Sequence, residues 1–364
     1  RDPLGFAKQV GIDAESVSGT AVVDLAFDFP LLKDLEWEDV SASATANAYS
    51  VNIPQGLFGL DIFGGNLDIA IDRDGMDING EMLLEAFPTV LVWRQNFSAD
   101  KPFKNRYEMS THVTDVKDVT DLGIDVSPFS ADMIKGAVPL SLQVTEQFDG
   151  TSVLEANAVL DSVELVANAI NWRKPMGSSG KAQVTIDLVN DQISSIPKFD
   201  VQTDDLVVSG SALYDEPGGR LSRIDLDQIK YGRNDISGLL VPGGEGVWDA
   251  DFRGASLDLT DVWDEVIHSD LLTSGESFLE DIGVSVQFDR VWLSEDRGVN
   301  NLTGAFARES ELWETIYVTA NVDSGESLEI KLTPSEKSNA RILTVWSLDA
   351  GSVLRTLDIY DNML

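Results

Sequence analysis

The sequence predicts an all-β protein: an elongated, twisted, mostly antiparallel sheet that forms a repeating β-groove with a few short capping helices. Three observations lead to this prediction. Apolar and polar residues alternate with a period of two in many short stretches. Turn pairs such as Asp74-Gly75 and Asp149-Gly150 separate these stretches. Stretches with helical periodicity are few and short.

The period-two stretches follow one another along the chain, and each has one apolar and one polar face. This alternation is typical of antiparallel sheets, because strands buried on both faces have continuous apolar runs. The apolar residues singled out from these stretches are Val23, Leu25, Phe27, Leu67, Ile69, Ile71, Ile78, Leu140, Leu142, Val184, Ile186, Val286, Phe288, Ile316, Val318 and Ile330.

Three short segments have a helical pattern: 115–122, 259–268 and 352–358. Three short helices cannot cover the apolar face of some twenty strands, so we expect something else to cover it. No linker rich in Pro or Ser and no charge block divides the chain. The prediction is therefore a single continuous segment, residues 1–364, cut from a longer protein.

A short motif recurs along the chain, in which an aliphatic residue is followed by Ser, Asn or Thr and then by Gly. Its copies end at Gly19, Gly80, Gly210, Gly238 and Gly304. Glycine inside a strand marks a bulge or a bend, so the recurrence predicts a strand-bend unit reused along a stack of strands. Coincidence in a β protein rich in Gly and Ser is the alternative.

Composition excludes several function classes. Acidic residues number 62 against 26 basic ones, a net charge of −36, which disfavours nucleic acids and anionic lipid headgroups as ligands. A solvated acidic face in a salty environment is the simplest reading of this charge. There is no cysteine, which excludes disulfides, thiol nucleophiles and Cys-based zinc sites. No run of about 18 apolar residues, the length that would span a membrane, is present.

No motif indicates catalysis, a metal or a cofactor. The two histidines, His112 and His268, are expected on the surface, and no G-x-S-x-G elbow accompanies them. Residues 177–182 resemble a phosphate loop, but Ala182 stands where Ser or Thr would bind Mg²⁺. Asp72 and Asp74 resemble the start of a calcium loop that lacks its bidentate Glu, so a tight hairpin is expected there. We predict that the chain is not an enzyme. The alternative is a polysaccharide-active enzyme, for which the 62 acidic residues offer many carboxylate pairs, but no sequence feature selects one of them.

Two tryptophans fall in period-two stretches. Trp93 follows Thr89 and Leu91, and Trp346 follows Ile342 and Thr344, each on a face taken to be apolar. Packing within the sheet is the simpler interpretation. The functional alternative is that the rings line the groove or its rim, where an amphipathic ring suits a lipid headgroup boundary.

A series of motifs resembles one family over nearly the whole chain. The series comprises DLAFDFPLLKDL over residues 24–35, GNLDI through DGMDING over 65–80, GRLSRIDL through GRNDISG over 219–238, and ASLDL over 255–259. In this order the segments resemble the YhdP-like branch of the AsmA superfamily, in its alphaproteobacterial type. Each motif is degenerate, and only the series is specific.

The resemblance implies a periplasmic segment of a lipid-transfer bridge attached to the inner membrane, in which an apolar β-groove holds phospholipid acyl chains. The partners it implies are those acyl chains, together with the inner-membrane anchor and the remaining segments of the same protein, which this chain lacks. The apolar residues given above are then the candidates for lining the groove. The alternative is a structural or assembly module of the cell envelope, whose apolar face packs on a second sheet or on a partner protein.

Overall fold

The computed structural model describes residues 15–33, 36, 39–114, 133–167, 172–243, 247–261, 263, 282–309, 312–335 and 341–358. Within these ranges the protein is all-β: one 19-stranded sheet, a small three-stranded sheet and the helix α4 (Ala350–Leu357). Every strand pair of the large sheet described below is antiparallel except one. The predicted all-β, mostly antiparallel fold class is therefore confirmed.

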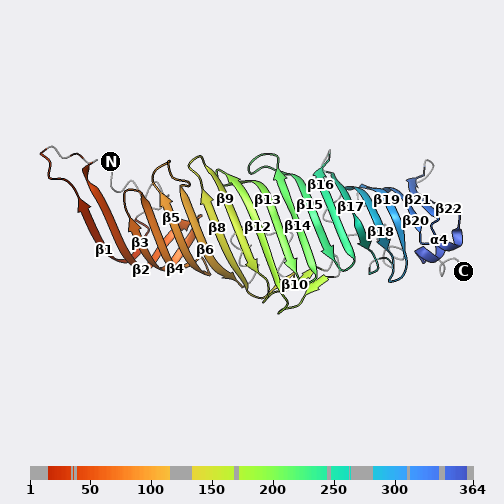
Figure 1. The fold of residues 1–364 in the computed structure, drawn as a ribbon, viewed down its shortest axis with the longest axis horizontal. Coiled ribbons are helices and arrows are strands. Elements are labelled where there is room, and N and C mark those ends of the chain that lie inside the picture. Colours follow the sequence, from red (N-terminus) through yellow and green to blue (C-terminus); the bar gives the residue numbers. More distant parts are fainter. Residues whose placement is uncertain are drawn as a thin grey trace. The chain divides into compact units, whose positions relative to one another are not determined.

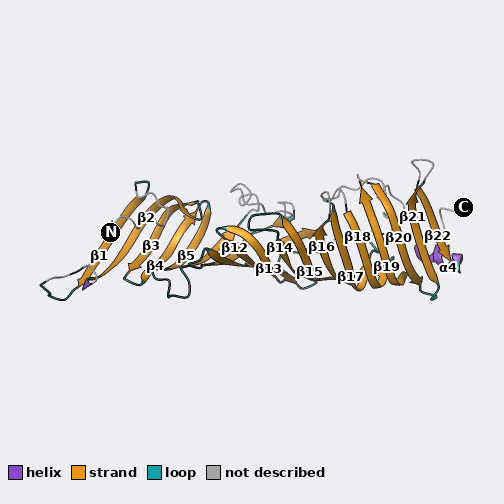
Figure 2. Cartoon of the chain, turned by 90° about the horizontal axis from the view of Figure 1, so that it is seen from above, coloured by secondary structure: helices purple, strands orange, loops and turns teal. Residues whose placement is uncertain are grey.

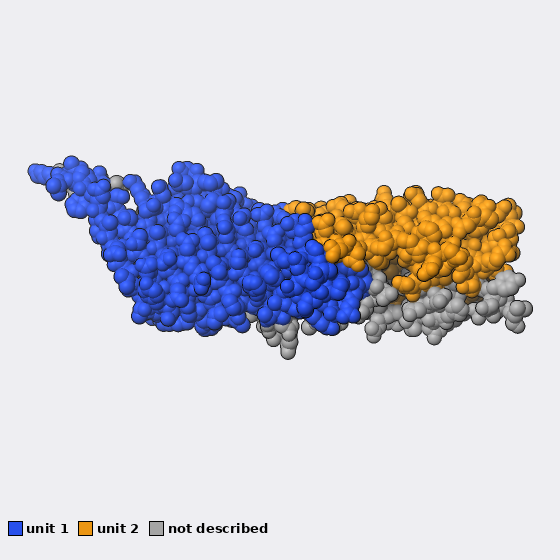
Figure 3. Space-filling model, turned by 60° about the horizontal axis from the view of Figure 1, so that its bottom comes forward, with its two compact units in different colours: residues 1–193 blue, residues 194–364 orange. Residues whose placement is uncertain are grey.

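The chain divides into two compact units, residues 1–193 and residues 194–364, which Figure 3 shows in different colours.

Unit 1 contributes nine strands to the large sheet, each hydrogen-bonded to the next in chain order (Figure 1). They are β1 (Ser18–Asp28), β2 (Ser41–Leu57), β3 (Leu60–Ile71), β4 (Gly75–Leu84), β5 (Phe87–Asn96), β6 (Asn105–Val113), β8 (Val138–Glu146), β9 (Thr151–Val159) and β12 (Gly180–Val189). The small sheet of unit 1 consists of β7 (Ile134–Lys135), β10 (Glu164–Ala167) and β11 (Trp172–Lys174).

Unit 2 holds the other ten strands, again paired in chain order. They are β13 (Gln192–Thr203), β14 (Leu206–Tyr214), β15 (Leu221–Tyr231), β16 (Asn234–Pro242), β17 (Trp248–Asp258), β18 (Ile282–Trp292), β19 (Gly298–Glu309), β20 (Leu312–Val322), β21 (Ser327–Pro334) and β22 (Arg341–Ser347). The pair β17–β18 is parallel, which requires the long connection between Asp258 and Ile282.

One of the three predicted helices is confirmed. The segment 352–358 corresponds to α4, whose first turn is capped by the Asp349 carboxylate, which accepts a hydrogen bond from the Ser352 amide at 3.0 Å. Figure 2 shows α4 in purple beside β22. The segment 115–122 lies outside the described residues, and so does most of 259–268, including His268.

Three of the five motif glycines lie at or beside irregularities of strand pairing, as predicted, whereas Gly80 and Gly304 pair without a shift with both of their neighbouring strands. Gly19 lies in a register irregularity between β1 and β2. Gly210 of β14 and Gly238 of β16 both pair with Leu226 of β15, and the pairing of β15 with each of these strands shifts register next to Leu226. Bulges of this kind increase the local twist and curvature of a sheet.

Four of these glycines also make room for a neighbouring side chain. A Cβ added to Gly238 would lie 2.5 Å from the Phe252 ring, and one added to Gly210 would lie 2.6 Å from the Phe199 ring. At Gly304 the nearest atom is in Phe306, and at Gly80 a Leu67 methyl lies 2.9 Å away. The motif therefore places a slot in the sheet that a large apolar side chain fills.

Candidate functional site

The apolar face of unit 1 can be followed from strand to strand, because directly paired residues of neighbouring strands point to the same side of a sheet. One unbroken row crosses all nine strands. It consists of Val23, Ala46, Ile69, Ile78, Trp93, Tyr107, Val144, Leu154 and Ile186. The adjacent row consists of Ala21, Ala48, Leu67, Gly80, Leu91, Met109, Leu142, Ala156 and Val184. Neither row contains a charged residue.

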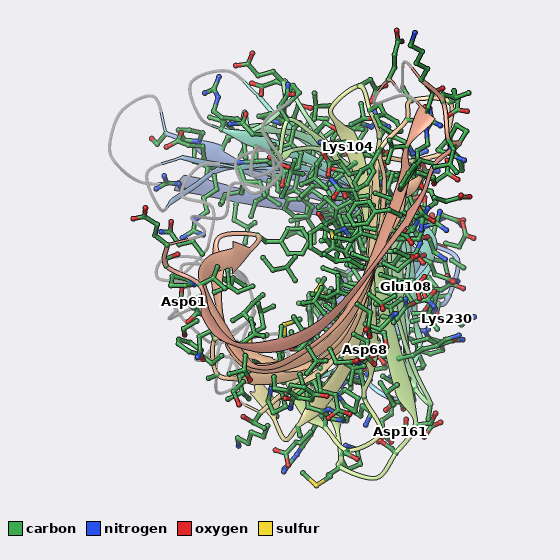
Figure 4. The ribbon with its side chains drawn as sticks, turned by 90° about the vertical axis from the view of Figure 1, so that its left-hand side faces the viewer. Asp61, Asp68, Lys104, Glu108, Asp161 and Lys230 are labelled. Atoms are coloured by element: carbon green, nitrogen blue, oxygen red, sulfur yellow. The ribbon has the colours of Figure 1, made fainter. Side chains whose placement is uncertain are left out.

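The opposite face of the same strands is mainly polar. A paired row there consists of Asn47, Asp68, Asn79, Val92, Glu108, Gln143, Glu155 and Thr185. Figure 4 shows the first strands of unit 1 curling into an open arc, with the labelled Asp68 and Glu108 toward its outer side. The apolar rows therefore lie on the inner side of this curl.

A cavity of about 340 Å³ lies on the apolar face of unit 1. Its floor includes Ile69, Ile78 and Trp93. The Trp93 ring packs on Tyr107, with ring centroids 5.1 Å apart, and its indole N–H donates to the Asn105 side chain at 3.2 Å. Burial raises the pKa of the Tyr107 hydroxyl, and the nearby Glu146 and Asp191 carboxylates raise it further. Tyr107 is therefore neutral at any physiological pH and belongs to the apolar row, where it packs on Trp93 beside the cavity.

Unit 2 has an equivalent row across its ten strands. It consists of Phe199, Gly210, Leu226, Gly238, Phe252, Val286, Gly304, Val318, Ile330 and Val345. The opposite face has the paired row Ser237, Arg253, Gln287, Thr303, Thr319, Glu329 and Trp346. Three of the repeat glycines thus fall on the apolar row of unit 2.

A second cavity, of about 420 Å³, lies on the apolar face of unit 2. The strand residues Ile316, Val318 and Ile330 form one part of its wall. Leu259, Trp263 and the α4 residue Leu357 form another part, and the Trp263 indole N–H donates to the Leu357 carbonyl at 3.2 Å. Helix α4 therefore closes one side of this cavity, as expected of a capping helix.

The structure places every predicted lining residue of each unit on that unit's apolar face. Those that line the cavities are Leu67, Ile69 and Ile78 in unit 1 and Ile316, Val318 and Ile330 in unit 2. Those that lie on the same faces outside the cavities are Val23, Leu25, Phe27, Ile71, Leu140, Leu142, Val184, Ile186, Val286 and Phe288. Phe288 is only 2% exposed and belongs to the packed core, whereas Leu25 on β1 is 66% exposed.

Several cavity residues were missed by the sequence analysis. Val51, Ile53, Leu57 and Ile62 come from the end of β2 and the start of β3, where register irregularities break the period of two. The alternation of apolar and polar residues ends there, so the high apolar content of the segment is the sequence signal that could have identified these cavity residues.

Trp346 was assigned to the wrong face. It pairs with Glu329 on the polar row, while its neighbour Val345 pairs with Ile330 on the apolar one. The expectation that Trp346 lies on the apolar face is therefore wrong. Trp93 lies on the apolar face, as predicted.

Three sequence features that we did not assign to catalysis or ligand binding close turns or lie on the surface in the described residues. The Asp72 carboxylate accepts hydrogen bonds from the amides of Asp74 and Gly75, at 2.8 and 2.9 Å, which closes the predicted tight hairpin and lowers the pKa of Asp72. The Gly177 and Gly180 amides donate to Asp161, so an acidic residue occupies the loop that resembled a phosphate site. His112 is exposed.

Two features are absent from the described part of the chain. No group of three or more His, Asp or Glu side chains there could hold a metal ion. No helix among these residues is both long and apolar enough to cross a membrane.

Comparison of the chain with models of protein families, with curated proteins and with solved structures gives no match. The resemblance to the YhdP-like branch therefore stays a prediction.

Proposed function

We propose that this chain is a section of a lipid-transfer bridge, in which the apolar faces of the two units hold the acyl chains of phospholipids. The proposal places the chain in the periplasm, attached to the inner membrane through parts of a longer protein, and carrying lipid between the inner and outer membranes. That location and the lipid class come from the family resemblance.

The observation that supports the proposal best is the pair of uninterrupted apolar rows in unit 1. Many of their members, including Ile69, Val144 and Ile186, are only half-buried. Apolar surface left in contact with water is costly, and a hydrocarbon chain laid on it would gain roughly 0.8 kcal/mol for each CH₂ group removed from water. Neither row contains a charged residue that would disfavour the binding of a hydrocarbon chain.

The two cavities are of a size that suits this ligand. Their volumes, about 340 and 420 Å³, fall within the usual range of small-molecule sites, roughly 300 to 1,000 Å³. Their walls are almost entirely apolar, so they favour hydrocarbon over a polar headgroup. A headgroup would remain at the rim or in solvent.

Native mass spectrometry of the purified chain tests the proposal. We expect adducts with the masses of fatty acids or phospholipids. In a Val318→Glu background, which places a charge in the unit 2 cavity, Ile186→Glu adds a charge to the apolar row of unit 1 and should remove most of the remaining adducts. Gln183→Glu adds the same charge to the same strand, β12, and should leave them unchanged. A chain that carries no lipid, or a Gln183→Glu variant that loses lipid as Ile186→Glu does, would contradict the proposal.

A structural or assembly module, whose apolar face packs on protein, is the alternative. It predicts that the purified chain lacks lipid and instead forms a defined complex, with itself or with another protein, that Ile186→Glu disrupts.

A further inference from the structure

The hairpin that joins β2 and β3 folds back over the apolar face of unit 1. β2 is 17 residues long and stays paired with β3 up to Leu57 and Leu60, and β3 stays paired with β4 as far as Ile62 and Leu84, so the end of β4 takes part in the same curl. We call residues 49–66 the flap. Figure 4 shows the strands curling back, with the labelled Asp61 near the end of the curl.

The bends that turn the flap inward are built into the sequence. The pairing of β2 with β3 has register irregularities between Ala48 and Val51, between Val51 and Ile53, and between Ile53 and Leu57. Ser50 and Gln55 have left-handed backbone conformations, each with φ of 51°. Closely spaced bulges of this kind bend a strand sharply.

Side chains bind the backbone amides near these bends. The Gln55 amide donates to the Asp61 carboxylate at 2.8 Å, and the Gly64 amide donates to the Asn52 side chain at 3.0 Å. The Asp61 amide in turn donates to the Glu85 carboxylate at 2.7 Å, which ties the flap, close to its tip, to the turn after β4. The bent conformation is therefore specified by hydrogen bonds within the flap and to the turn after β4.

The inner surface of the flap is apolar. Val51, Leu57 and Ile62 are each at most 7% exposed and pack in one cluster with Leu67, Ile78, Met82 and Trp93 of the floor. The cavity of about 340 Å³ lies between flap and floor, since both contribute to its lining. Only Ser18 and Thr20 of β1 bring hydroxyl groups to it.

The tip of the flap contacts Tyr107 of β6, which packs on the cavity residue Trp93, through one aromatic pair. The ring of Phe58 meets the ring of Tyr107 edge to face, with centroids 5.0 Å apart, although Phe58 is 53% exposed. The rest of the Phe58 ring is open to solvent. On the side of β6 the tip is therefore held by an exposed aromatic contact, whereas on the side of β4 it is held by backbone pairing and by the hydrogen bonds between Asp61 and Glu85.

We propose that the flap closes the unit 1 cavity over a single unbranched hydrocarbon chain, and that it opens when Phe58 leaves Tyr107. The proposal rests on the proposed function, because it assigns the chain-binding cavity a gate. The apolar lining and the volume fit one hydrocarbon chain and offer a headgroup no ionic partner. Opening where Phe58 meets Tyr107 lets the chain enter and leave, while the pairing of β3 with β4 keeps the flap in register.

Reversible locking of the flap tests this. The chain has no cysteine, so the double variant Phe58→Cys/Tyr107→Cys can be joined by a short thiol-reactive crosslinker that a reductant cleaves. The control is Asp68→Cys/Asn79→Cys, a directly paired position on the polar face. Both pairs are made in a Val318→Glu background, which places a charge in the unit 2 cavity and confines the probe to unit 1.

The probe is cis-parinaric acid, whose fluorescence reports its release from the protein to phosphatidylcholine vesicles. We expect the crosslinked 58/107 variant to release the probe at least roughly tenfold more slowly than the control, with the rate restored by the reductant. Phe58→Ala should speed release roughly two- to tenfold, the range that corresponds to the loss of one aromatic pair.

Equal release from the two crosslinked proteins would overturn the flap proposal while leaving the proposed function intact. A protein that binds no probe even before crosslinking, although hydrogen exchange shows that it is folded, would overturn both.

Discussion

The slot that Gly238 provides for Phe252 leads to the sharpest prediction for stability. The backbone of Gly238 is not left-handed, so alanine there would not be strained by its own conformation. Its Cβ would lie 2.5 Å from one Phe252 ring atom and 2.9 Å from another, well inside van der Waals contact. The Phe252 ring must therefore move, and it is itself part of the apolar row of unit 2.

The expected cost of Gly238→Ala follows from two opposing effects. Overpacking of a close-fitting site costs about 1–3 kcal/mol. Replacing glycine by alanine also restricts the unfolded chain, which recovers about 0.4–1 kcal/mol. We expect a net loss of about 1–2 kcal/mol in the free energy of unfolding, measured by urea denaturation followed by tryptophan fluorescence.

A double-mutant cycle assigns that loss to the ring. Phe252→Ala removes the obstacle, so adding Gly238→Ala to it should cost roughly nothing, giving a coupling energy of about 1–2 kcal/mol. Gly65→Ala is the control, because its Cβ would meet its nearest neighbours at 3.5–3.6 Å, an ordinary contact, and should change stability by less than about 0.5 kcal/mol. If Gly238→Ala proves as mild as Gly65→Ala, or if the cycle shows no coupling, the slot explanation is wrong.

Three further predictions concern single polar groups. Lys174 is 1% exposed, and its ammonium group donates to three backbone carbonyls at 2.7, 3.0 and 3.4 Å. Lys174→Met should therefore lower the free energy of unfolding by about 2–4 kcal/mol and speed amide hydrogen exchange in β10 and β11. Unchanged exchange in these strands would refute this prediction. The Arg290 guanidinium holds the pKa of Asp323 below its usual value in the folded protein. The pair therefore stabilises the fold fully at a pH above the pKa that Asp323 has in the unfolded chain, and this stabilisation is lost as the pH falls through the pKa that Asp323 has in the folded protein. Unfolding midpoints of the wild type and Asp323→Asn should therefore differ most near pH 6 and converge in acid, and a gap that widens in acid would reverse the sign of the argument. Asp349→Ala removes the cap of α4 and should lower the free energy of unfolding by about 1 kcal/mol. It should also weaken the binding of cis-parinaric acid in the unit 2 cavity, which fluorescence titration measures. Gly351→Ala is the control substitution in the same helix.

Period-two alternation was sufficient to predict most of the fold. It depends only on local sequence, because a strand with one buried face must place apolar residues at every second position. Ile69, Ile78 and Ile186 come from three such stretches, and strand pairing in chain order brings them into one row. These three residues share one face of unit 1 because a meander needs no long-range choice of partner.

What alternation could not predict lies where the strands are irregular. The flap depends on consecutive bulges in β2 and on contact with Tyr107 in β6, and neither has a local periodic signal. Trp346 was assigned to the wrong face because the edge strand β22 has exposed apolar residues on both sides, among them Ile342 and Val345. The parallel pairing of β17 with β18 likewise depends on the path of a long connection.

The most direct test of the central claim, that the apolar face holds hydrocarbon chains, is a photocrosslinking scan along β12. A photoreactive phenylalanine analogue would replace each residue from 182 to 188 in turn, and crosslinks to co-purified or added phospholipid would be counted by mass spectrometry. The account predicts a period of two, with lipid captured from Ala182, Val184, Ile186 and Leu188 and not from Gln183, Thr185 and Asp187. Crosslinking that is equal on both faces, or that captures protein in place of lipid at Val184 and Ile186, would contradict it.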